Sequence, residues 1–132
     1  MHTTNTPDTL VTPAEDCAAV TKVPEREGSV AAMQFAMLQG APYARTSDEV
    51  LSGVAADRKG VGGAERDAFL AAWASKGQPC FRASPLTKTH GWAVHSDAEG
   101  RVALVDPNGP EFERLMADDA VTKVAAMRSR RA

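Results

Sequence analysis

The feature that most constrains the fold is a β-hairpin signature over residues 91–105. Two β-favouring stretches, Gly91-Trp-Ala-Val-His-Ser96 and Arg101-Val-Ala-Leu-Val105, flank the polar string Asp97-Ala-Glu-Gly100. A glycine at the end of such a string takes positive φ at no steric cost, which favours a chain reversal here. The sequence therefore predicts two antiparallel strands joined by a tight turn.

The pairing register follows from the length of the loop. If those four residues are the whole loop, Ser96 faces Arg101 and His95 faces Val102. One face of the hairpin is then wholly apolar and points into the core; it holds Trp92, Val94, Ala103 and Val105. The other face is apolar apart from one histidine and should be partly covered; it holds Ala93, His95, Val102 and Leu104.

Helical patterns occur on both sides of the hairpin. Apolar residues at helical spacing predict a helix over 30–38, which Ser29 caps and Gly40 ends. The string Thr46-Ser-Asp-Glu49 fits a capping box and begins a second helix. A third helix carries Phe69, Leu70 and Trp73, and a short fourth helix starts at Pro110 and turns Phe112, Leu115 and Met116 inward.

These elements favour a single small α+β domain, because the chain has only 132 residues. Three to five helices should pack on a small antiparallel sheet that includes the hairpin at about 91–105, and Thr9-Leu-Val-Thr12 could add a third strand. Residues 1–117 are assigned to the domain. Residues 118–132 have weak helical spacing and a basic end, so they are expected to form a mobile or weakly helical tail.

Composition and charge argue against several classes of protein. The formal net charge is −2 and the sequence pI about 5.9, so nucleic-acid binding is unlikely. The sequence contains neither a signal-peptide pattern nor an apolar run long enough to cross a bilayer. Two cysteines, Cys17 and Cys80, form neither a disulfide framework nor a CxxC pair. We expect a cytoplasmic protein with no membrane partner, no metal and no cofactor.

An acid-poor segment is the strongest indication of a binding site. No acidic residue occurs between Asp67 and Asp97, and this segment has a net charge of +3 against −5 for the rest. Such a segment can attract a small anionic ligand or an acidic peptide. The candidate ligand-binding residues are Lys76, Arg82, Ser84, Lys88 and His90. The alternative is a surface loop whose basic side chains are only solvated.

Cys80 is the candidate nucleophile of a second hypothesis, a thiol-dependent enzyme or a redox-responsive protein. Nearby cations stabilise a thiolate, and Arg82 is two residues away; His95 is the candidate catalytic base, with His90 as another possibility. The alternative is that Cys80 is a small buried hydrophobe and His95 a neutral structural histidine. A zinc site from Cys80, His90 and His95 is disfavoured, because alternate strand positions point to opposite faces.

The last ten residues suggest a third possibility. Lys123, Arg128, Arg130 and Arg131 place four positive charges there without an acidic residue, which could give weak, salt-dependent association with nucleic acid. A solvated tail explains the same pattern. No GxSxG, HExxH, GxGxxG or phosphate-loop motif occurs, so no reaction is indicated.

Several strings resemble a family of small, mostly bacterial proteins classed as a domain of unknown function. The most specific string is Ser75-Lys-Gly-Gln-Pro-Cys-Phe-Arg-Ala-Ser-Pro-Leu86. Similar strings are Met1-His-Thr-Thr-Asn5, Glu15-Asp-Cys17, Tyr43 with Thr46-Ser-Asp48, Gly91-Trp92, Asp97-Ala-Glu-Gly100, and Ala126-Met-Arg-Ser-Arg-Arg-Ala132. The segment from Val20 to Ser29 departs from the family by being shorter. The resemblance implies a stand-alone domain and transfers no activity and no catalytic residue.

Overall fold

A computed structural model describes residues 3–17 and 20–128 of the chain. The described residues form a five-stranded sheet in the order β2-β4-β3-β1-β5. The strands are β1 (Thr9–Thr12), β2 (Arg45–Thr46), β3 (Ala93–Ser96), β4 (Arg101–Val105) and β5 (Thr122–Ala125). Three of the pairings are antiparallel, whereas β5 runs parallel to β1. The predicted α+β class is confirmed, and the sheet is mixed rather than purely antiparallel.

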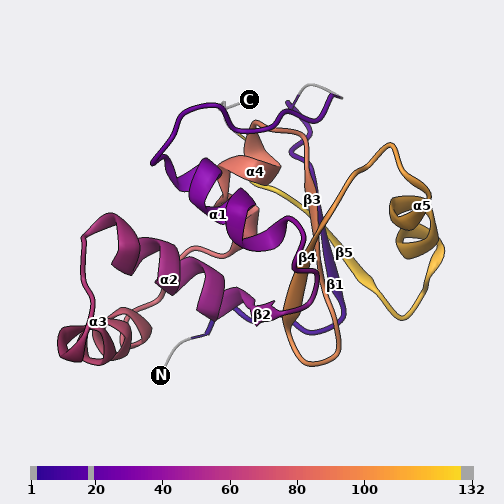
Figure 1. Ribbon diagram of the computed structural model, residues 1–132. Helices are drawn as coiled ribbons and strands as arrows, with labels where there is room; N and C mark the ends of the chain where they lie inside the picture. Colours follow the sequence, from indigo (N-terminus) through magenta and orange to yellow (C-terminus); the bar gives the residue numbers. More distant parts are fainter. Residues whose placement is uncertain (1–2, 18–19, 129–132) are drawn as a thin grey trace.

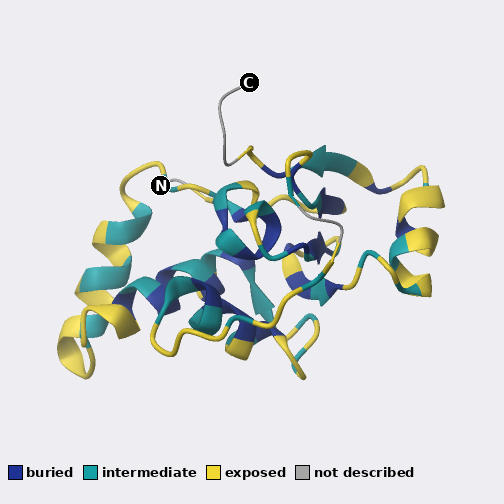
Figure 2. Ribbon diagram, turned by 90° about the horizontal axis from the view of Figure 1, so that it is seen from above, coloured by how far each residue is buried: buried dark blue, intermediate teal, exposed yellow. Residues whose placement is uncertain are grey.

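Helices cover the two faces of this sheet unequally (Figure 1). One face is covered by α1 (Val30–Leu38), α2 (Ser47–Arg58), the 3₁₀ turn η1 (Phe81–Ala83) and α4 (Pro85–Lys88). Helix α5 (Pro110–Ala117) lies on the opposite face. Helix α3 (Ala64–Ala74) packs on α2 at the periphery and contains no buried residue (Figure 2). We call the face under α1, α2, η1 and α4 the helix-covered face and the opposite one the α5 face. The helix-covered face holds most of the core.

The predicted helix starts are confirmed in atomic detail. The Ser29 hydroxyl accepts the Ala32 amide at the start of α1. At the start of α2, the Thr46 hydroxyl accepts the Glu49 amide, while the Glu49 carboxylate accepts the Thr46 amide. These reciprocal bonds satisfy amides that have no partner inside a helix.

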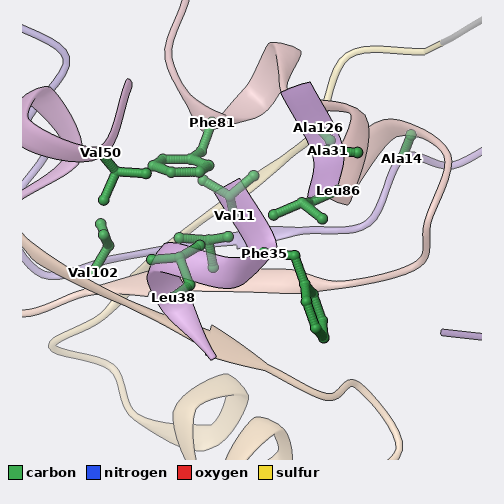
Figure 3. Packing of buried hydrophobic residues seen from close by; sticks show 11 residues of the cluster. Val11, Ala14, Ala31, Phe35, Leu38, Val50, Phe81, Leu86, Val102 and Ala126 are labelled. Atoms are coloured by element: carbon green, nitrogen blue, oxygen red, sulfur yellow. The ribbon is translucent and has the colours of Figure 1, made fainter. Parts of the chain in front are cut away.

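Two apolar clusters hold the layers together. The larger cluster lies between the sheet and α1, α2, η1 and α4, and Figure 3 shows Phe81 pointing toward Val11 and Val50 within it. Its buried members are Val11, Ala14, Ala31, Phe35, Leu38, Val50, Phe81, Leu86, Val94, Val102 and Ala126. The smaller cluster lies under α5; its buried members are Leu10, Ala93, Val105, Leu115 and Val121. Both faces of the hairpin are thus covered.

The predicted hairpin register is wrong by one residue. Ser96 pairs with Val102 and His95 with Ala103. The loop consists of three residues, because the Asp97 amide donates to the Arg101 carbonyl at 2.9 Å and Gly100 has a φ of 79°. A turn followed by a glycine at positive φ is the three-residue hairpin loop with a bulge. As a result, Val94 shares its face with Val102, and His95 shares the α5 face with Val105.

The assignment of residues 118–132 to a mobile or weakly helical tail is also wrong for the described part. Residues Thr122–Ala125 form β5, and Val124 pairs with Val11. Val121 and Ala126 are buried, one in each apolar cluster, so the segment belongs to the domain. Parallel pairing with β1, which lies more than one hundred residues away in the sequence, stabilises this segment. The local periodicity of residues 118–128 does not indicate such a distant partner. Residues 129–132 lie outside the described residues.

No helix in the described part of the chain is both long enough and apolar enough to span a membrane.

Candidate functional site

A cavity of about 270 Å³ lies at the β5 end of the sheet, on the helix-covered face. We call it the sheet-edge pocket. Its floor is formed by β1, β3 and β5, and its walls by residues 4–6, the start of α2 and the segment Cys80-Phe-Arg82. Its volume is close to the lower limit for ligand pockets of about 300 Å³, which suits a metabolite-sized molecule.

The floor of the sheet-edge pocket consists of two rows that cross the three strands in register. Thr9 pairs with Ser96 on one side and with Thr122 on the other, which gives a row of hydroxyl groups. Two residues further along β1, Val11 pairs with Val94 and Val124 to give a row of valines: Val94, Val11 and Val124. Residues two apart on a strand share a face, so both rows point into the cavity.

Ser96 is the most informative member of the hydroxyl row. It is only 4% exposed, yet no described residue makes a hydrogen bond to its hydroxyl. Every fully enclosed side-chain oxygen in the described part of the chain has a hydrogen-bond partner, so the Ser96 oxygen must be open to the cavity. A buried polar group without a protein partner carries a free-energy cost that a ligand or water can offset.

Residues 3–5 form an N-terminal arm that closes one wall of the pocket. The Asp48 carboxylate accepts hydrogen bonds from the Thr3 hydroxyl, the Thr4 hydroxyl and the Thr4 amide. The Thr4 and Ser47 hydroxyls also bond to each other at 2.8 Å, and the Asn5 side chain accepts the Asp48 amide. Burial acts to raise the pKa of Asp48, but the bonds from Thr3 and Thr4 together lower it below its usual value.

Cys80 and Arg82 line the opposite wall. The Arg82 Nε donates to the Ala125 carbonyl at 2.8 Å, and the Arg82 carbonyl accepts the Met127 amide at 2.7 Å. These bonds hold the guanidinium beside β5, while no carboxylate in residues 3–17 or 20–128 pairs with it. Cys80 is a free, partly buried thiol. Of the predicted candidates, the structure brings only Cys80 and Arg82 into one pocket.

The other predicted ligand-binding residues do not line the sheet-edge pocket. Ser84 is buried, caps α4 by accepting the Leu86 amide, and donates to Gln34, so its role is structural. His90 bonds to the Pro85 carbonyl and lies in a loop beside residues 22–25. Lys88 lies next to Thr89, and Lys76 is exposed after α3. The candidate residues of the acid-poor segment therefore do not gather in one site, because the segment crosses from α3 to the sheet.

His95 is not close to Cys80, and the predicted catalytic pair is not formed. Cys80 lies over the face that carries Val94 and Ser96, whereas His95 lies on the α5 face. The alternation of side chains along β3 separates the two. In the described part of the chain, no group of three or more His, Cys, Asp or Glu residues could hold a metal ion.

His95 instead forms a pair with Tyr43. The Tyr43 hydroxyl lies 2.7 Å from His95 Nδ1, and the rings meet edge to face. Tyr43 adopts a φ of 59°, which is rare for a residue with a side chain, and its amide donates to the Val102 carbonyl. Sequence reasoning missed this pair, since Tyr43 lies in an irregular loop far from the hairpin in sequence.

Both members of the pair titrate abnormally. Burial, more than any other cause, lowers the pKa of His95, although Asp97 and Glu111 act to raise it. Burial also raises the pKa of Tyr43, and the negative charge of Glu111 adds to that effect. At neutral pH both groups are therefore uncharged, and the histidine tautomer decides which of the phenol and Nδ1 donates the hydrogen bond.

The positive charges near the C-terminus are partly engaged with the domain. Lys123 Nζ donates to the Asp118 carbonyl, and Arg128 pairs with Glu15. Arg130 and Arg131 lie outside the described residues. Pairing within the domain reduces the charge that the described part of this segment can offer to nucleic acid.

The hydroxyl row and the N-terminal arm were not predicted as site residues. Thr9 and Ser96 were recognised only as strand residues, and Thr122 was assigned to the tail. The available signal was the resemblance itself. Three strings that carry it contribute Thr4, Ser47 and Cys80 to the walls of this pocket.

Comparison with known proteins gives the family and nothing on activity. No curated protein and no solved structure matches the chain. A match to the family of unknown function DUF6157 extends over residues 1–132, and this agrees with the resemblance seen in the sequence. The chain belongs to DUF6157, a family of unknown function.

Proposed function

We propose that this protein is a non-catalytic binding domain that holds a small anionic ligand in the sheet-edge pocket. The observation that carries the proposal is the position of Arg82. Its guanidinium is fixed to the Ala125 carbonyl, lines the pocket, and has no carboxylate partner among the described residues. Of the basic residues that the sequence offers between 76 and 95, Arg82 lines the pocket, whereas Lys76 and Lys88 do not.

The character of the lining supports an anion. Arg82 is the one charged residue among the described residues that line the cavity. The hydroxyls of Ser96 and Thr122, which donate to no described residue, can donate to a bound oxyanion. The small volume of about 270 Å³ favours a small molecule over an acidic peptide as the ligand.

Thermal unfolding in the presence of anions tests this proposal. Inorganic phosphate, acetate and hexanoate would be compared at constant ionic strength, because a ligand that binds only the folded state raises the unfolding midpoint. At a ligand concentration of one hundred times Kd, the expected stabilisation is about 2.7 kcal/mol. Arg82→Ala should bind these anions more weakly and show a smaller shift at the same ligand concentration.

Lys76→Ala is the matched control, because this variant removes an exposed cation of the same acid-poor segment that lies outside the pocket. It should leave the shift unchanged. The proposal is wrong if none of the three anions raises the midpoint, or if Arg82→Ala binds as well as the parent protein.

A second candidate function is a redox-responsive protein that uses Cys80. The observation in its favour is that this free thiol lines the same pocket as Arg82. A thiol-dependent enzyme has less support, because no histidine or carboxylate of the described residues lines the pocket to act as a base. The test is the alkylation rate of Cys80 against pH in a Cys17→Ser protein. A midpoint well below about 8.5 would indicate a stabilised thiolate, and slow alkylation at every pH would exclude this candidate.

A cytoplasmic location and a bacterial origin stay predictions. One feature supports the location: both cysteines are free thiols, as is usual in a reducing compartment. Fractionation of cells that express the protein would test it.

A further inference from the structure

The two rows on the pocket floor specify more than an anion. We infer that the ligand is a short-chain hydroxycarboxylate, whose carboxylate meets Arg82 and whose hydroxyl meets the row formed by Ser96, Thr9 and Thr122. This inference rests on the proposed function, because it uses the same pocket and the same cation. It adds the chemistry of the ligand's other end.

The order of groups along the strands sets the order of groups in the ligand. Arg82 is fixed at Ala125, which lies immediately beyond Val124 and therefore at the valine end of the floor. The hydroxyl row lies at the other end, two residues along each strand from the valine row. A ligand that reaches both ends must place an apolar section over the valines. Because two strand residues span about 6.8 Å, that section is a few carbon atoms long.

The hydrogen-bond inventory of the hydroxyl row favours a hydroxyl on the ligand. The Thr9 hydroxyl donates its proton to the Pro7 carbonyl at 3.0 Å, so towards the cavity its oxygen can only accept. Ser96 has no described partner and can donate as well as accept. A ligand hydroxyl can donate to Thr9 and accept from Ser96 at the same time. A ketone or ester oxygen can only accept, so it could bond to Ser96 but could give no proton to the Thr9 oxygen.

Ser96 provides independent support for a ligand at this end of the pocket. Its side chain is more than nine-tenths buried and open to the cavity, without any described partner. A valine or alanine at this position would fill the floor without that desolvation cost. Arg82 and Ser96 thus line separate parts of one cavity, and each side chain can be replaced without changing the other.

The test compares 6-hydroxyhexanoate, hexanoate and 1,6-hexanediol by NMR titration of the backbone amides. These probes keep the chain length constant while they remove the hydroxyl or the charge. We expect 6-hydroxyhexanoate to bind about threefold to tenfold more tightly than hexanoate, the gain from one or two net hydrogen bonds. Binding of 1,6-hexanediol should be the weakest of the three.

Two variants assign the preference to the two ends. In Ser96→Ala, the preference for 6-hydroxyhexanoate over hexanoate should shrink, because the ligand hydroxyl loses its donor and keeps only Thr9 as an acceptor. In Arg82→Ala, both acids should weaken by the same factor and the preference for the hydroxyl should remain. Ser52→Ala removes a buried serine of α2 outside the pocket and should change neither affinity. Amide spectra of each variant would show that the fold is retained.

The outcomes separate this inference from the proposed function. Equal affinity for hexanoate and 6-hydroxyhexanoate in the parent protein would overturn the inference and leave anion binding intact. A preference that is undiminished in Ser96→Ala would overturn it as well. If 1,6-hexanediol binds as tightly as the acids, or if no acid binds, the proposed function fails together with the inference.

Discussion

The two faces of the sheet differ in how they use buried polar groups. On the helix-covered face, a large apolar cluster from several helices surrounds the strands, and the hydroxyl groups of the strands form a row at the β5 end. On the α5 face, five buried apolar residues are accompanied by a histidine that bonds to a tyrosine. The first face combines a stable core with an open pocket, whereas the second has a titratable group beside a thin core.

The difference originates in the helices. Helix α1 buries Phe35 and Leu38, and α2 buries Val50, so that face is packed from several directions. Helix α5 has eight residues, of which only Leu115 is buried. A short helix that is attached through one buried side chain should open more readily than the rest of the domain.

Replacing one leucine on each face measures this difference directly. Leu86 and Leu115 are both almost fully buried, at 0% and 2% exposed. Leu86→Ala should lower the free energy of unfolding by about 4 kcal/mol, because the large cluster cannot collapse around the cavity. Leu115→Ala should cost about 2 kcal/mol, since α5 can move inward. Urea unfolding of both variants gives the two values.

Equal losses of unfolding free energy in the two variants would show that the two faces behave as one cooperative core. Hydrogen exchange of the α5 amides adds a second readout. In Leu115→Ala these amides should exchange faster than those of α1, and in Leu86→Ala the two helices should lose protection together.

Local signals in the sequence were sufficient for most of the fold. The capping box at Thr46 and the serine cap at Ser29 start helices because their bonds involve residues only three positions apart. The α+β class, the hairpin and the added strand Thr9–Thr12 follow from similar short-range patterns. The register was missed because a bulge at Gly100 moves every pairing by one residue.

The candidate site depends on long-range pairing and was therefore predicted only in part. Arg82 and Cys80 were found from local charge and reactivity, and both line the pocket. Thr122 and Ser96 meet only through β1, which pairs with one strand on each side. The residue pattern within β3 or β5 does not indicate that both strands pair with β1. The same argument explains why His95 was assigned to Cys80 rather than to Tyr43.

Acid pH should weaken the α5 face more than the helix-covered face. The pKa of His95 is lowered by burial in the folded state, so the unfolded chain binds its proton more readily. The stability from this group is complete above about pH 6.5, the ordinary histidine value, and is lost as the pH falls towards the lower folded pKa. Asp97, Glu111 and Asp8 oppose the shift and Arg114 reinforces it, so the net effect should be smaller than that of Leu86→Ala.

The measurement is the free energy of unfolding between pH 7.5 and 5.5. A His95→Gln protein should lose the part of the pH slope that His95 contributes. The matched control is His90→Gln, which removes a partly exposed histidine from the loop after α4 and leaves the His95–Tyr43 pair in place. The same slope in His95→Gln as in the parent protein would show that the α5 face does not respond to this proton.

The smallest expected effect concerns the N-terminal arm, which closes the pocket on the helix-covered face. Asp48→Asn keeps the shape of the side chain but removes its negative charge. It also replaces one of the two carboxylate oxygens that accept hydrogen bonds from Thr3 and Thr4 by an NH₂ group, which cannot accept them. We expect a loss of about 1 kcal/mol, the net value of an ordinary hydrogen bond. The Thr4 amide, which donates to Asp48 Oδ1, should exchange with solvent faster, while amides of α5 should not change.

Because the hydrogen bonds lower the pKa of Asp48, their contribution is complete above about pH 4, and protonation should release the parent arm below that pH. If acid leaves the Thr4 amide protected, the arm is held by packing, and the wall of the pocket is as rigid as its floor.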